Sequence, residues 1–158
     1  MAEGVLSSAS RRSAIADAET AAFLAGDAGQ AVAYMTDDVL IRPPGFLLGQ
    51  RELRGREQAR AFVEEFKTTL PRDRKVELTK RRHFVDQADE RRLLVVDELT
   101  VSPKNASDRG EPGTFTTEFA ALFTFTDADR ICRLESWATE EEGRAQLVEP
   151  APVRPPGG

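Results

Sequence analysis

The sequence predicts an α+β fold in which helices cover one face of an antiparallel sheet. Ahead of Pro71 the apolar residues recur at helical spacing, and after it apolar and polar residues alternate as they do in strands. Short turns join most of the alternating runs, which favours antiparallel pairing of consecutive strands. Because the helices gather at one end of the chain, we expect them on one side of the sheet. The 158 residues are enough for one domain with a buried core.

The first half of the chain predicts three helices and one short strand. The first helix begins after Ser13, which can cap it, and ends at Gly26. A second, short helix covers residues 29–35 and leads into a strand at 39–41, and a third helix covers 56–69. The apolar stripes of the two longer helices are Ile15, Ala18, Ala22, Phe23 and Ala25, and Ala59, Phe62, Val63 and Phe66.

The second half predicts four long strands followed by a short helix. The strands are residues 76–85, 91–101, 114–126 and 131–138, and the helix is 139–147. The domain is therefore expected to span 13–147, between a flexible N-terminus at 1–12 and a disordered tail at 148–158. The tail is rich in Pro and Gly, and Pro lacks the N–H group that a helix or a central strand needs.

Composition and charge exclude several classes of function. The net charge of −5 argues against a nucleic-acid partner, and the basic clusters 72–75 and 80–82 have acidic residues nearby, as a solvated surface does. Cys132 is the only cysteine, so no intrachain disulfide can form and a reducing compartment is expected. No run approaches the ~20 apolar residues of a membrane span, and no secretory signal precedes the domain, so a cytoplasmic location is expected. Neither metal-ligand spacing nor a glycine-rich phosphate loop occurs, which predicts no cofactor.

Three stretches together resemble the nuclear transport factor 2-like superfamily, especially its SnoaL-like and ketosteroid-isomerase-like members. They are residues 23–39 (FLAGD through AYMTDDV), 53–62 (LRGREQARAF) and 129–137 (DRICRLESW). The resemblance implies a cone-shaped α+β barrel, whose curved antiparallel sheet wraps around the helices and leaves an apolar pocket. It also implies a homodimer through the outer sheet face, where Trp137 is expected to lie.

The catalytic residues of these relatives have no counterparts here. The position of the isomerase base holds Pro43, and the position of its oxyanion-hole Asp holds Ala121. The epoxide hydrolases of this superfamily use an Arg and two Asp, whereas the matching stretch Asp97–Thr100 contains no Arg and Ser136 stands at the position of the last Asp. Dehydratases of the scytalone type use several Tyr and His, and this chain has one of each.

The remaining candidates for acid–base chemistry are Asp97, Glu98 and His83. Alternation places Asp97 inside the pocket if Leu93 and Leu99 face inward, and a register change by one residue would place Glu98 there instead. A carboxylate in an apolar cavity can have its pKa raised and act as an acid or a base, or it can pair with an Arg and hold the sheet. His83 is expected to face solvent but could carry a proton.

Five further residues are candidates for contact with a ligand. They are Arg42, Tyr34, Phe119, Phe123 and Ser136. Arg42 could bind a substrate carboxylate or make a surface ion pair, and Tyr34 is also expected to contribute to packing.

These observations predict an enzyme that isomerises, cyclises or dehydrates a small hydrophobic or polycyclic metabolite. The alternative is a ligand-binding or dimerisation module without catalysis. An open cavity lined by Asp97 and a second polar group would favour the enzyme, and a cavity filled by phenylalanines would favour the alternative.

Overall fold

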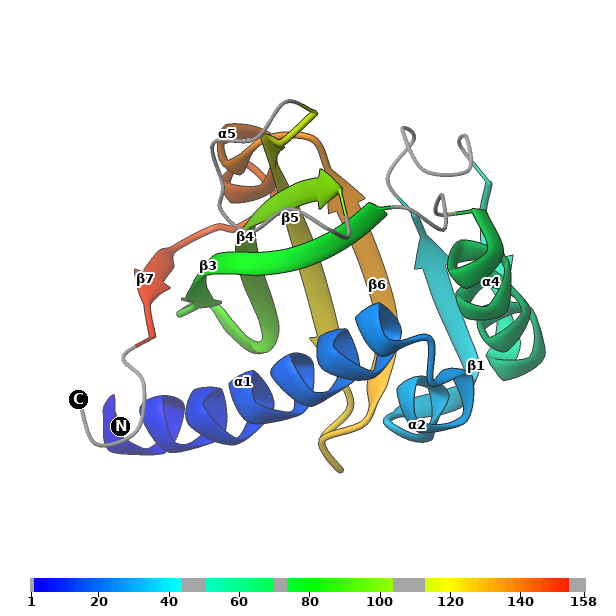
Figure 1. The fold of residues 1–158 in the computed structure, drawn as a ribbon. Coiled ribbons are helices and arrows are strands. Elements are labelled where there is room, and N and C mark those ends of the chain that lie inside the picture. Colours follow the sequence, from blue (N-terminus) through cyan, green and yellow to red (C-terminus); the bar gives the residue numbers. More distant parts are fainter. Residues whose placement is uncertain (1, 44–50, 70–73, 104–112, 154–158) are drawn as a thin grey trace.

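The computed structural model describes residues 2–43, 51–69, 74–103 and 113–153, and it confirms the predicted α+β architecture (Figure 1). The helices are α1 (Ala2–Ala25), α2 (Ala28–Ala33), α4 (Gly55–Thr69) and α5 (Glu140–Arg144). The strands are β1 (Met35–Arg42), β2 (Leu53–Arg54), β3 (Arg74–Asp86), β4 (Asp89–Pro103), β5 (Phe115–Phe125), β6 (Ile131–Trp137) and β7 (Pro150–Pro152).

The seven strands form one curled sheet in the order β2-β1-β6-β5-β4-β3-β7. Strands β3 to β6 pair antiparallel in sequence order, as the short turns predict. Strand β1 pairs parallel with β6, which is the exception to antiparallel pairing among the described strands. The connection between these two strands contains β2, α4 and β3 to β5, and it is long enough to permit a parallel pair.

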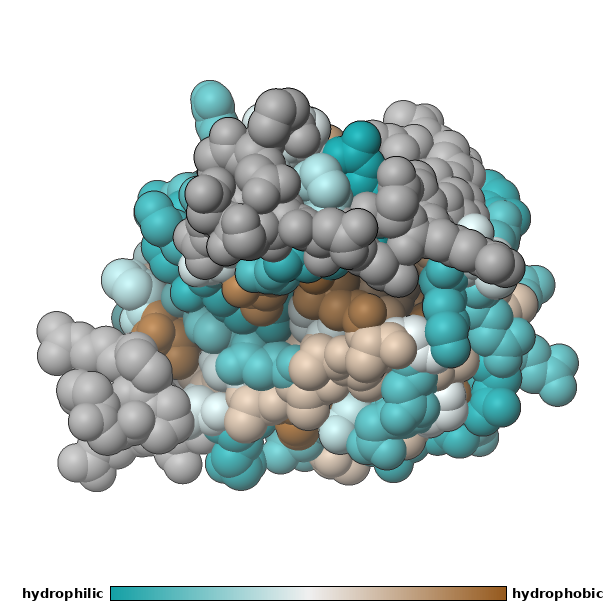
Figure 2. Space-filling view, viewed as in Figure 1, coloured by the Kyte–Doolittle hydropathy of each residue, from teal (hydrophilic) through white to brown (hydrophobic). Residues whose placement is uncertain are grey.

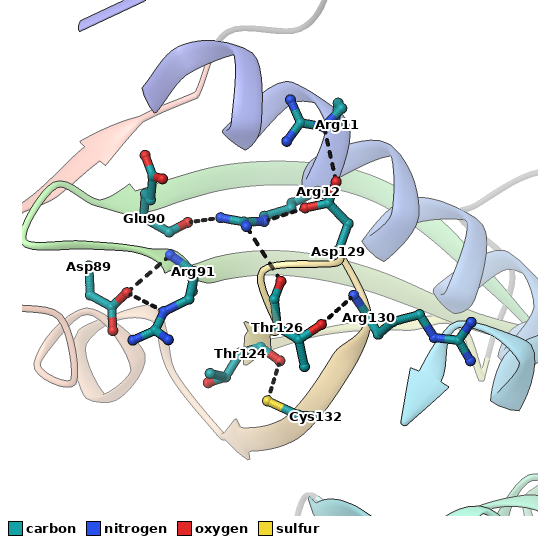
Figure 3. A network of polar contacts seen from close by, with 10 residues as sticks. All are labelled: Arg11, Arg12, Asp89, Glu90, Arg91, Thr124, Thr126, Asp129, Arg130 and Cys132. Atoms are coloured by element: carbon teal, nitrogen blue, oxygen red, sulfur yellow. Dashed lines mark hydrogen bonds and ion pairs between the residues drawn. The ribbon is translucent and has the colours of Figure 1, made fainter. Parts of the chain in front are cut away.

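Helix α1 begins at Ala2, so the predicted start after Ser13 is wrong. Arg12 is only 4% exposed and fixes this part of the helix to the sheet. Its Nε lies 2.9 Å from an oxygen of Asp129 in the β5–β6 turn, and its Nη1 donates to the carbonyl of Glu90 (Figure 3). These contacts are made by residues more than 70 positions away, so no local sequence signal could reveal them.

The C-terminal segment forms the short strand β7, within the stretch 148–158 for which no strand is predicted. Strand β7 pairs with the end of β3 at the edge of the sheet, where a Pro needs to donate no ladder hydrogen bond on its outer side. The fully buried Asp86 accepts hydrogen bonds from the backbone N–H groups of Val148 and Glu149, both at 3.0 Å. The rest of the predicted tail, 154–158, lies outside the described residues.

Each face of the sheet has its own apolar core. The inner core lies between the sheet and α1, α2 and α4, and contains side chains such as Val39, Phe62 and Phe123. The outer core lies beneath α5, whose N-cap is Thr139, and Trp137 packs against it on the outer face, as predicted. Gly143 allows α5 to approach closely, because a Cβ atom there would lie 2.6 Å from that of Ala120.

Candidate functional site

A cavity of about 490 Å³ lies between the inner face of the sheet and helices α1 and α4. In the space-filling view, hydrophobic side chains are visible between α1 and β3 (Figure 2). Six phenylalanines line the cavity without filling it: Phe23, Phe62, Phe66, Phe115, Phe119 and Phe123. The polar and charged lining residues are Glu19, Thr20, Arg74, Arg81, Asp97, Thr117 and Ser136.

The two ends of the cavity differ in exposure and polarity. At one end lie Glu19 and Asp97, which are 5% and 1% exposed. At the other end lies Phe115, which is 56% exposed and stands beside Val101 on the neighbouring strand. The cavity therefore runs from a closed end at Glu19 and Asp97 to an open mouth at Phe115.

Arg81 and Asp97 form a bidentate ion pair at the closed end. The Nε and Nη2 atoms of Arg81 lie 2.6 and 2.7 Å from the two carboxylate oxygens. Nη2 also donates to Thr20 Oγ1, and Nη1 donates to Asp17 and to the carbonyl of Ala16. Burial lowers the pKa of Arg81, but the hydrogen bonds and charges of Asp97 and Asp17 raise it more, so the guanidinium stays charged. All five of its N–H groups are used within the protein.

A bulge in β3 is what turns Arg81 toward the cavity. Leu78 pairs with Leu99, but Lys80 pairs with Glu98, so Thr79 is the additional residue. Without the bulge, strict alternation would place Arg81 on the face opposite Leu78. The hydroxyl of Thr79 donates to the carbonyl oxygen or to the carboxylate of Glu98, each at 3.0 Å, which holds the bulge in place.

Glu19 is the second carboxyl group at the closed end, and among the described residues it has no ion-pair partner. Its nearest polar contact is the hydroxyl of Thr20, 3.5 Å from Oε2. Burial raises the pKa of Glu19 to about 7, because the nearby charge of Arg81 only partly offsets the loss of hydration. Glu19 can therefore exist as an acid and as a carboxylate near neutral pH.

Asp17 joins Arg81 to His83. The His83 Nε2 atom is 2.8 Å from Asp17 Oδ1, which also accepts from Arg81. Burial raises the pKa of Asp17, but the hydrogen bonds from His83 and Arg81 outweigh it and lower the pKa overall. The His83 side chain is 17% exposed and packs toward α1, so the expectation that it faces solvent is wrong. The bulge at Thr79 is the reason, because it moves His83 to the inner face together with Arg81.

The structure brings four of the predicted site residues together and leaves four apart. Asp97, Phe119, Phe123 and Ser136 line the cavity. Glu98 lies on the opposite face of β4, and His83 and Tyr34 are not in the cavity wall; the hydroxyl of Tyr34 accepts from Gln30 instead. Arg42 is exposed and pairs with Glu52 and Glu135, which is the surface alternative that the sequence left open.

Glu19, Thr20 and Arg81 line the cavity but are not among the residues predicted from the sequence. A signal for Glu19 was present, because it lies four residues from both Ile15 and Phe23 and so interrupts the apolar stripe of the first helix. No comparable signal existed for Arg81, whose direction depends on the bulge.

Two other properties bear on the class of protein. Within the described ranges no three His, Cys, Asp or Glu side chains are grouped as metal ligands would be. No helix in the described part of the chain is long and apolar enough to cross a membrane.

Comparison with known proteins agrees with this architecture. The sequence profile of the SnoaL-like domain matches residues 16–134, which is most of the chain. The chain belongs to the SnoaL-like domain family. No curated protein sequence matches it.

Solved structures of similar fold come from several proteins. A candidate polyketide cyclase from Xanthomonas campestris superposes with a TM-score of 0.62 at 18% identity, covering 88% of this chain and 98% of that one. SalBIII, an epoxide hydrolase/cyclase-like enzyme of pyran ring formation in salinomycin, gives 0.58 at 16% identity, with 83% and 92% covered. An NTF2-like protein from Burkholderia xenovorans gives 0.58 at 19% identity, with 87% and 95% covered. At these identities the likeness establishes the shared fold.

Proposed function

We propose that this SnoaL-like protein is an enzyme that acts on a small hydrophobic metabolite by acid–base chemistry of the isomerase, cyclase or dehydratase type. Glu19 is the proposed proton-transfer group. The observation that carries the proposal is a buried carboxyl group that faces an apolar cavity, lacks an ion-pair partner among the described residues and has its pKa raised to about 7. A general acid or base works best when its pKa lies near the working pH. Cyclase and cyclase-like enzymes among the proteins of similar fold support the same class of chemistry.

The neighbouring groups suggest how Glu19 would be held. Thr20 Oγ1 accepts from Arg81 at 2.8 Å and lies beside the Glu19 carboxyl group. The charge of Arg81 stabilises the carboxylate form without pairing with it directly, so Glu19 keeps an oxygen for the substrate. A carboxylate form would remove a proton from carbon, and the acid form would return a proton to carbon or to a leaving oxygen.

Asp97 receives a positioning role in this proposal. The sequence favoured it as the proton-transfer group, with pairing to an Arg as the alternative. Both of its oxygens accept from Arg81, and its side chain has no exposed surface. It would therefore orient Arg81, and through it Thr20, whereas Glu19 would meet the substrate.

The test is exchange of α-protons on a panel of hydrophobic ketones in D₂O, followed by NMR. We expect the protein to accelerate exchange on at least one ketone and Glu19→Gln to lower that rate about 10²- to 10⁴-fold. Glu57→Gln, at an exposed position of α4 outside the cavity wall, is the matched control and should keep the rate. Equal rates for Glu19→Gln and the unaltered protein, or no acceleration on any ketone, would exclude the proposed role.

The competing proposal is a ligand-binding module of the same fold without catalysis. Its support is that every N–H group of Arg81 is already used within the protein, so Arg81 has no free donor to stabilise a negative charge that develops at the closed end. In that case hydrophobic ketones would bind but would not exchange.

We also propose a cytoplasmic homodimer that associates through the outer sheet face. Helix α5 covers the region around Ala120, so a partner would contact the strands beside it, where Arg133 and Glu135 form an ion pair. Light scattering should give twice the chain mass, and a monomer at micromolar concentration would exclude this arrangement.

A further inference from the structure

Arg74 is a cation at the mouth of the cavity whose charge is not matched by the described part of the chain. It is the first residue of β3 and lines the cavity together with Val76, Val101 and Phe115. Its Nη1 donates to the carbonyl of Gly113 at 2.7 Å, and this is its single hydrogen bond to a described residue. Among the ion pairs between described residues, none includes Arg74. Its guanidinium therefore retains N–H groups that can donate to a ligand.

The closed end has the opposite character. The charge of Arg81 is neutralised there by the bidentate contact with Asp97, and Glu19 adds a further carboxyl group. An anionic group placed at this end would meet no available donor of Arg81 and would be repelled by any ionised carboxylate. An uncharged polar group, in contrast, can exchange a hydrogen bond with Glu19.

The distance between the two ends sets the length of a ligand that reaches both. Arg74 and Arg81 lie on one strand, seven residues apart, which corresponds to roughly 20 Å along the backbone. The wall between them is apolar, with Val76 on β3 and Leu99 and Val101 on the neighbouring strand. The cavity therefore suits an elongated apolar body with different groups at its two ends.

We propose that the substrate is an elongated hydrophobic acid whose anionic end binds Arg74 at the mouth and whose uncharged reactive end reaches Glu19. This assignment rests on the proposed function and adds to it the charge and the orientation of the substrate. A carboxylate or another singly charged oxyanion would accept the hydrogen bonds of the guanidinium. Because Arg74 is partly exposed, it contributes selection and orientation more than raw affinity.

Two fluorescent probes that differ in one anionic group test this proposal. They are 1-anilinonaphthalene-8-sulfonate and uncharged N-phenyl-1-naphthylamine, each titrated into the unaltered protein, Arg74→Gln, Arg74→Lys and Lys75→Gln. We expect Arg74→Gln to weaken binding of the sulfonate about tenfold, equivalent to about 1.4 kcal/mol, and to change binding of the neutral probe less than twofold. Lys75, which pairs with Glu77 and does not line the cavity, is the matched control and should change neither.

The other variants and a competition measurement sharpen the result. Arg74→Lys should restore most of the sulfonate affinity, and added salt should weaken sulfonate binding to the unaltered protein more than to Arg74→Gln. The neutral probe should displace the sulfonate, since both occupy one cavity. Equal effects of Arg74→Gln on both probes, no effect on either, or failure to compete would overturn the anionic assignment. If the unaltered protein binds neither probe, the hydrophobic cavity of the proposed function fails as well.

Discussion

Helix α1 is held to the sheet by two arginine–carboxylate clusters, each of which contains a buried guanidinium group. Near its N-terminal half, Arg12 pairs with Asp129 and donates to two backbone carbonyls, as Figure 3 shows. Near its C-terminal half, Arg81 pairs with Asp97 and donates to groups of the helix. The two guanidinium side chains are 4% and 9% exposed, so burial of the arginine does not distinguish the clusters.

The difference is the additional carboxyl group and the cavity beside it. In the first cluster the carboxylate of Asp129 accepts from both Arg11 and Arg12. In the second, Glu19 has no ion-pair partner among the described residues and faces about 490 Å³ of open space. A buried ion pair is thus a poor indicator of a functional site by itself. A buried carboxyl group that lies beside a cavity without an ion-pair partner is a better indicator of a functional site.

The largest expected loss of stability comes from breaking the ion pair between Arg81 and Asp97. Arg81→Met should lower the free energy of unfolding by about 3–5 kcal/mol, because Asp97 would remain buried without a cation. Urea denaturation monitored by circular dichroism measures this loss. Arg81→Met combined with Asp97→Leu should recover most of it, and a double variant as unstable as the single one would contradict the role given to the pair.

The next largest effect is a change in the free energy of unfolding with pH, which arises from the carboxyl group of Glu19. Its folded pKa of about 7 lies above the ordinary value of 4.5, so the unfolded chain loses this proton first as the pH rises. The contribution to stability is complete below pH 4.5, decreases between 4.5 and 7, and is lost above 7. At about 1.4 kcal/mol per pH unit, the loss is about 3 kcal/mol.

Comparison with Glu19→Gln separates the pH dependence that Glu19 causes from that of the other titrating groups. Unfolding free energies measured at pH 4 and pH 8 should show the unaltered protein losing about 3 kcal/mol relative to Glu19→Gln. A constant difference between the two proteins would mean that Glu19 titrates as it does in water.

The smallest effects should come from the first cluster, where two arginines share Asp129. Arg12→Met should lower the free energy of unfolding by about 1–3 kcal/mol, because the carbonyls of Glu90 and Thr126 would lose a buried donor. The Arg11 side chain is 54% exposed, so Arg11→Met should lower the free energy of unfolding by less than about 1 kcal/mol. Thermal unfolding of the two variants gives the ranking directly, and the reverse order would show that exposure does not govern this cluster.

Much of the architecture could be predicted because its signals are local. The helix around Phe62 and the four long strands follow from apolar spacing, and alternation with Leu93 and Leu99 favours Asp97 over Glu98 as the inward carboxylate. The extension of α1 to Ala2 and the pairing of Pro150–Pro152 could not be predicted, since both depend on contacts with distant residues such as Asp129 and Asp86.

In the candidate site, too, some features follow from local sequence patterns and others follow from contacts between distant residues. Local patterns in the sequence are enough to predict a SnoaL-like domain in which one carboxylate of β4 faces inward. The ion pair between this carboxylate and Arg81 depends on the folded chain, because a single bulge at Thr79 reverses the faces of β3. The position of Glu19 as an acid without an ion-pair partner among the described residues also depends on the folded chain, since it follows from where α1 crosses the sheet and from which charges are already paired there.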